Sequence, residues 1–230
     1  MRQERRPART GRRLAYALVG GTLAYNVVEG VVAILSGVES RSIVLVTFGI
    51  DSYLEVAAAA AVLWRFAAPD DEVGERREER ALRLIGATFI LLAAGVLAQA
   101  LLALGGTRGA EGSTIGLILL LASLLVMPAV SFAKLGVAAS WNIPSLAAEA
   151  RETIACSYLS LTALVGVVAT AAFGWWWIDP TFALLMIPWL LREGVEGLRG
   201  DACFDGSVVC FCRGCWFGMR TCPSACCAAA

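Results

Sequence analysis

Long apolar segments bounded by charged residues make up most of the chain. Six such segments lie at roughly 14–36, 42–67, 81–105, 114–138, 150–173 and 176–191. A helix that crosses the hydrocarbon core of a bilayer needs about 20 apolar residues and hydrogen-bonds its own backbone. The pattern therefore predicts an all-α fold, a polytopic membrane protein with a six-transmembrane-helix bundle.

Charged segments mark the expected domain boundaries. Residues 1–13 form a basic N-terminus, residues 14–199 the transmembrane domain, and residues 200–230 a short cysteine-rich tail. The segment 69–80, PDDEVGERREER, is polar enough to predict a solvated loop between the second and third spans. The apolar stretch that follows the basic start is too long for the core of a signal peptide and has no small-residue cleavage site, so we expect no cleavable signal.

Basic residues orient the predicted bundle. Segments rich in Lys and Arg stay on the cytoplasmic side of a membrane, and six spans place both termini on one side. With the termini inside, seventeen of the 19 Lys and Arg residues are cytoplasmic, and only Arg41 and Arg108 lie outside. We therefore expect a multi-pass protein of the cell (inner) membrane with cytoplasmic N- and C-termini.

Composition supports a lipid environment and narrows the functions. Hydrophobic residues make up 58% of the chain, and the mean hydropathy is +0.71, well above the values typical of soluble domains. Lys+Arg and Asp+Glu both number 19, and no basic stripe with interleaved aromatic residues indicates a nucleic-acid partner. Histidine is absent, so a metal site would have to use carboxylates and thiolates.

Two acidic residues lie deep in the second span, in FGIDSYLEVAAAAAV. Asp51 and Glu55 are four residues apart and share one helix face, and Asp51 lies roughly 13 Å from the outer end of the span, near the bilayer midplane. Burial disfavours the charged form of both carboxyls, and a divalent cation between them would offset that cost. The pair therefore predicts an ion site. The alternative is that one carboxylate pairs with an arginine, but no arginine lies deep in any predicted span.

The fifth span repeats this spacing with Glu152 and Cys156 in EARETIACSYLS. Because the two spans run in opposite directions, Glu55 and Glu152 should share a level toward the cytoplasmic side of the membrane. Asp51 and Cys156 should share the level of the midplane. The four side chains could therefore converge on zinc or a similar ion, which accepts both oxygen and sulfur ligands. Cys156 could instead be a small packing residue, and Glu152 could pair with Arg151 or lie at the membrane interface.

Two further sets of polar residues bear on metal handling. Asn26 and Glu29 in the first span, YNVVEGVVAILSG, could line the ion path or hydrogen-bond a neighbour. The tail holds seven of the eight cysteines, including the C-x-C-x-x-C cluster of Cys210, Cys212 and Cys215. Disulfides are rare in the reducing cytoplasm, so this cluster indicates a soft-metal binder. The alternative is an unstructured tail of variable composition.

Several stretches resemble one transporter family. The segment NVVEGVVAILSGVESRSIVLVTFGIDSYLEV is similar to the first two spans of the cation diffusion facilitator family, and REERALRLIGATF, EARETIACSYLS and WWWIDPTFALLMIPWLLREGVEGLRG resemble further landmarks. The resemblance covers residues 14–200. It implies that Asp51, Glu55, Glu152 and Cys156 bind the transported ion, that protons are exchanged for it, and that the protein is a homodimer.

The chain also departs from that family in two ways. Zinc transporters of the family usually have histidine or aspartate in place of Glu152 and aspartate in place of Cys156. We further expect the chain to lack the family's usual cytoplasmic ferredoxin-like domain, so that only the transmembrane domain is represented.

Together these observations predict a transporter that moves a divalent transition-metal cation out of the cytoplasm. Zinc is favoured, with cadmium, iron or manganese as alternatives, and no prosthetic group is expected. The alternative function is a metal-binding membrane sensor, or another non-transporting membrane protein that keeps the site. An enzyme is not expected, because the chain has no His-containing metal motif or nucleophile elbow, and Ser52 beside Asp51 has no base partner.

Overall fold

Six α-helices form the whole of the regular structure that the computed structural model describes, which covers residues 9–40, 43–69, 72–105, 114–141 and 143–200. In chain order they are α1 (Arg9–Glu39), α2 (Ile43–Phe66), α3 (Glu72–Leu104), α4 (Thr114–Trp141), α5 (Pro144–Phe173) and α6 (Ile178–Arg199). This confirms the predicted all-α bundle of six helices.

Five of these helices, α1 to α5, are long and apolar enough to cross a membrane. The sixth, predicted as a span at 176–191, is not among them, because the described helix extends to Arg199 and carries several charged residues in its second half. The protein is thus consistent with a multi-pass α-helical membrane bundle, and the sixth crossing stays a prediction. The first helix begins at Arg9, inside the segment 1–13 that we had assigned to the N-terminus.

The prediction of a solvated loop at 69–80 is wrong for most of that segment, because α3 begins at Glu72. Acidic side chains near a helix N-terminus are favoured by the helix dipole, and Glu72 also pairs with Arg76 one turn later, at 3.7 Å. Arg65 at the end of α2 donates to Glu78 at 2.8 Å. Polarity alone therefore misled the prediction, since a polar segment also forms a helix where its charges pair along one face.

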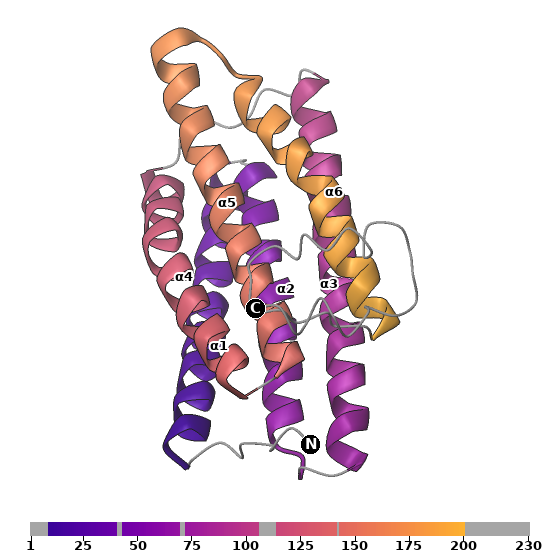
Figure 1. Cartoon of the computed structure of the whole chain (residues 1–230). Helices are drawn as coiled ribbons and strands as arrows, with labels where there is room; N and C mark the ends of the chain where they lie inside the picture. The colour runs from indigo at the N-terminus through magenta and orange to yellow at the C-terminus, as the bar shows by residue number, and fades with distance from the viewer. Residues whose placement is uncertain (1–8, 41–42, 70–71, 106–113, 142, 201–230) are drawn as a thin grey trace.

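The helices alternate in direction, and they divide into a group of four and a pair. Contacts join α1 to α2, α2 to α5, α5 to α4 and α4 to α1, which closes a ring of four helices. Figure 1 shows α3 and α6 lying side by side next to this ring. In Figure 1, α1 and α3 begin and α2 ends at the lower end of the molecule. The last helix, α6, runs toward the same end.

Glycines allow the closest helix approaches. A Cβ on Gly30 of α1 would lie 3.2 Å from the carbonyl oxygen of Gly49 on α2. A Cβ on Gly86 of α3 would lie 2.5 Å from the amide nitrogen of Leu198 and 2.7 Å from the carbonyl oxygen of Gly194 on α6. Small residues at such positions let backbones pack tightly inside a membrane. The α1–α2 approach brings the polar side chains beside Gly30 onto the polar face of α2.

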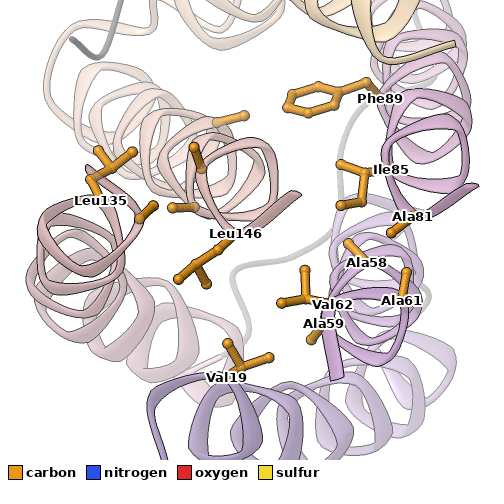
Figure 2. Close-up of a cluster of buried hydrophobic side chains, with 14 of the residues drawn as sticks. Val19, Ala58, Ala59, Ala61, Val62, Ala81, Ile85, Phe89, Leu135 and Leu146 are labelled. Atoms are coloured by element: carbon orange, nitrogen blue, oxygen red, sulfur yellow. The ribbon is translucent and has the colours of Figure 1, made fainter. Parts of the chain in front are cut away.

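Apolar side chains fill the interior toward the end of the bundle where α2 connects to α3. Figure 2 shows Val19, Val62, Ile85, Leu135 and Leu146 pointing inward from five different helices. All five are buried, with at most 7% of their surface exposed. This cluster forms an apolar layer on one side of the polar site described next.

Candidate metal centre between the second and fifth helices

Three potential metal ligands meet between α2 and α5. One ligand atom each from Asp51, Glu55 and Cys156 lies within 4.8 Å of the other two. All three residues are buried, with 5%, 2% and 1% of their surface exposed. The helices α2 and α5 are in contact, which confirms that they are neighbours and that Asp51 and Cys156 approach closely. Whether the three residues bind a metal stays a prediction.

The helix geometry explains why these residues meet. Asp51 and Glu55 are one turn apart on α2, so both project from the face that packs against α5. Cys156 stands near the middle of α5, twelve residues after Pro144 at the start of that helix. Proline suits the first helical turn because its missing N–H would have no helical partner there. The helix therefore starts well before the predicted boundary at residue 150 and is long enough to hold Cys156 within the bundle.

The carboxylates of the site have oxygens without protein partners. Asp51 Oδ1 and Glu55 Oε1 are buried and accept no hydrogen bond. An unpartnered buried oxygen is costly, since it has lost its water and gained no donor. Two carboxylate oxygens and a sulfur so close together match the ligand types of a divalent transition metal. The arrangement can hold such an ion, which would satisfy all three groups at once.

The first helix supports the site with two polar residues. Asn26 Nδ2 donates to Glu55 Oε2 at 2.6 Å, whereas the other oxygen of that carboxylate, Oε1, has no hydrogen-bond partner. Glu29 accepts two hydrogen bonds, from the Tyr25 hydroxyl at 3.0 Å and from the Ser52 hydroxyl at 3.1 Å. Of the two interpretations of Glu29, the structure thus shows hydrogen bonding to neighbours. Our expectation that Ser52 has no base partner is wrong, because its hydroxyl lies on the Glu29 carboxylate.

A hydroxyl from α4 completes the surroundings of the sulfur. Ser123 Oγ lies 4.0 Å from Cys156 Sγ, within hydrogen-bond reach for sulfur, and Ser123 is fully buried. All four helices of the ring therefore place polar groups around one point, although only α2 and α5 contribute the three potential ligands.

Glu152 does not join this group of three, so the predicted convergence of four ligands is not seen in the described conformation and stays a prediction. Its side chain is completely buried, and neither of its carboxylate oxygens has a hydrogen-bond partner. The alternative that Glu152 pairs with Arg151 is wrong, whereas its level relative to the membrane interface stays a prediction. Arg151 instead donates to Glu193 on α6 at 3.0 Å. Consecutive helix residues project about 100° apart, so Arg151 and Glu152 face different neighbours.

Two buried ion pairs near the site were missed by the sequence analysis. Lys134 on α4 pairs with Glu149 on α5 at 2.5 Å, and both are almost fully buried. The other is the pair of Arg151 and Glu193. The available signal was Lys134 itself, which lies inside the apolar segment 114–138 and was counted only as a cytoplasmic charge. A charge inside a span is expensive and therefore indicates a partner.

Apolar side chains close the site at both ends. Ala58 and Val62 lie one and two turns beyond Glu55 on α2 and belong to the apolar cluster of Figure 2. On the other side, Ala33 and Phe48 form a second apolar cluster that includes Cys156. Such layers limit the access of water to the three ligands.

The predicted soft-metal cluster of Cys210, Cys212 and Cys215 lies outside the described residues. The chain matches no protein-family model, and no curated protein is similar enough to count as a relative. The site is therefore interpreted from its own chemistry.

Proposed function

We propose that this protein binds a divalent transition-metal cation between α2 and α5 and carries it across the membrane. The observation that supports this most directly is the meeting of three buried ligand atoms from Asp51, Glu55 and Cys156. The four helices around the site, α1, α2, α4 and α5, are all long and apolar enough to cross a bilayer. Ionisable groups at such positions in membrane proteins commonly mark ion pathways.

Electrostatics favours a mobile cation at this site. Asp51 and Glu55 are like charges in a desolvated interior, and each keeps one oxygen without a donor. The two buried cationic side chains of the described structure are engaged elsewhere, with Lys134 on Glu149 and Arg151 on Glu193. Neutralisation must therefore come from protons or from a bound cation. Because both compete for the same oxygens, metal binding releases protons and proton binding releases metal.

This competition makes exchange of the metal for protons the transport mechanism we propose. The excess of Lys and Arg on one side predicts that both termini are cytoplasmic. In this orientation, protons that enter the cell would drive the metal out of the cytoplasm. The resemblance to the cation diffusion facilitator family supports the same mechanism and a homodimer as the working unit, and the distribution of basic residues supports the cell membrane as the location.

Proteoliposomes that report metal and proton movement test the proposal. Asp51→Asn keeps the shape of the side chain and removes its charge, so it should abolish Zn²⁺ uptake and the proton counter-movement. Glu152→Gln should weaken uptake less, because Glu152 lies outside the ligand group. Asp179→Asn is the matched control, since Asp179 lies in the first turn of α6 and outside the ligand group. Unchanged uptake in Asp51→Asn would contradict the mechanism, and metal uptake without proton movement would indicate a uniporter.

The second candidate is a metal sensor that binds but does not transport. The apolar layers on both sides of the site favour it, because they restrict the access of a hydrated ion to the ligands. Equilibrium binding separates the two functions. A protein that binds Zn²⁺ through Asp51 and shows no flux in the same liposomes would be a sensor.

A further inference from the structure

The sulfur in the ligand group distinguishes this site from a simple pair of carboxylates. Cys156 is 1% exposed, and its Sγ lies within 4.8 Å of a ligand oxygen from both Asp51 and Glu55. The chain contains no histidine, so no imidazole can supply the softer ligand. Whatever preference the site has for one class of metal must therefore arise from this thiol.

Ligand softness predicts what the thiol does. Carboxylates alone suit Mg²⁺, Ca²⁺ and Mn²⁺, whereas thiolates favour zinc and similar thiophilic ions. We infer that Cys156 is the specificity-determining residue of the site, selecting thiophilic divalent cations such as Zn²⁺ and Cd²⁺ over Mn²⁺ and Mg²⁺. The inference rests on the proposed metal site and adds the class of ion that the site accepts.

The coordination step is simple in chemical terms. The metal–sulfur bond forms as the S–H bond breaks, the proton leaves to water, and no atom changes oxidation state. The Ser123 hydroxyl, 4.0 Å from the sulfur, can donate to the sulfur once the thiol proton has left. Ser123 acts as a positioning residue, since outer partners that orient a ligand tune its affinity for metal.

Geometry explains why the thiol can reach an ion held by α2. Zinc ligands lie about 2.0–2.3 Å from the ion in a tetrahedral arrangement, so two ligand atoms on one ion are separated by roughly 3.3–3.7 Å. The ligand atoms of Asp51, Glu55 and Cys156 lie within 4.8 Å of one another. Side-chain movements of about 1 to 1.5 Å would therefore close the three groups on one cation.

The test uses the full chain with its tail thiols removed, so that Cys156 is the sole thiol. The parent protein carries Ser in place of Cys203, Cys210, Cys212, Cys215, Cys222, Cys226 and Cys227. Purified in detergent micelles, it is titrated with Cd²⁺, Zn²⁺ and Mn²⁺. Binding affinities are measured by competition, and coordination by sulfur is measured from the ultraviolet thiolate-to-cadmium charge-transfer band.

We expect the parent protein to show a charge-transfer band whose intensity saturates at one Cd²⁺ per protein chain. Cys156→Ser should abolish the band and lower the preference for Zn²⁺ over Mn²⁺ by roughly tenfold or more. Even the loss of a residue that only hydrogen-bonds a metal ligand typically lowers metal affinity about 10–100-fold. Cys156→Asp should bind Mn²⁺ more tightly than the parent. Ser157→Ala is the matched control, because the Ser157 hydroxyl bonds the Thr153 carbonyl of its own helix, and it should leave band and preference unchanged.

The outcomes separate this inference from the proposed transport. Absence of the band in the parent, or an unchanged Zn²⁺ to Mn²⁺ preference in Cys156→Ser, would overturn the role of Cys156 even if flux persists. A band and a thiol-dependent preference without any flux would keep the inference and reject transport. If Cys156→Ser fails to fold, the parent protein still tests the inference, because absence of its charge-transfer band would refute coordination by Cys156.

Discussion

Removing one partner of the buried pair between Lys134 and Glu149 should destabilise the protein strongly. Lys134 Nζ lies 2.5 Å from Glu149 Oε1, and the two side chains are 0% and 2% exposed. A buried charge that loses its partner typically costs about 3–5 kcal/mol, so we expect Lys134→Met or Glu149→Leu alone to lower the free energy of unfolding by that amount. The double variant should lie within about 1 kcal/mol of wild type, because no uncompensated charge then remains.

Unfolding by SDS in mixed micelles, followed by circular dichroism, gives the four free energies of this double-mutant cycle. The control is the pair of Glu79 and Arg83, whose side chains are about half exposed. Its single variants should change stability by less than about 0.5 kcal/mol, as exposed helix pairs do. The reasoning would be refuted if Lys134→Met cost no more than the control variants, or if the losses of Lys134→Met and Glu149→Leu simply added in the double variant.

Three further predictions concern packing, orientation and the tail. Gly86→Ala should lower the free energy of unfolding by about 1–3 kcal/mol through overpacking, since its Cβ would lie 2.5 Å from the backbone of α6. Gly95→Ala is the control, because a Cβ there would have no neighbouring atom within 4 Å, and it should be neutral or stabilising in the same unfolding assay. A membrane-impermeant thiol label should fail to reach a cysteine placed at Glu75 in intact cells, and labelling from outside would reverse the proposed orientation. Deleting residues 203–230 should lower total metal binding without abolishing flux, and complete loss of flux in an inserted protein would contradict an accessory role.

Secondary structure was largely predictable because membrane helices leave a strong signal in the sequence. Each of the first five predicted spans corresponds to a helix, since an apolar run of about 20 residues must satisfy its backbone internally. The errors lie at the ends, where α3 begins at Glu72 and α5 at Pro144. Those boundaries depend on charge pairing and a proline start, which an average over apolar residues does not detect.

The pairing of residues within one helix was also predictable. Asp51 and Glu55 share a face because four residues make about one turn. The same rule grouped Glu152 with Cys156, and there it was insufficient. Only Cys156 joins the ligand group in the described conformation, since a shared face does not fix which of two side chains reaches across to a neighbouring helix.

By itself, the sequence determined an α-helical membrane bundle, the absence of imidazole ligands and the polar faces of α2 and α5. The tertiary structure decided which charges meet: Lys134 with Glu149, Arg151 with Glu193, and Glu29 with Ser52. Helix periodicity fixes the direction of a side chain relative to its own axis, and that information is local. The rotation and spacing of neighbouring helices depend instead on how their side chains pack across the bundle, and only that packing brings residues distant in the chain to one point.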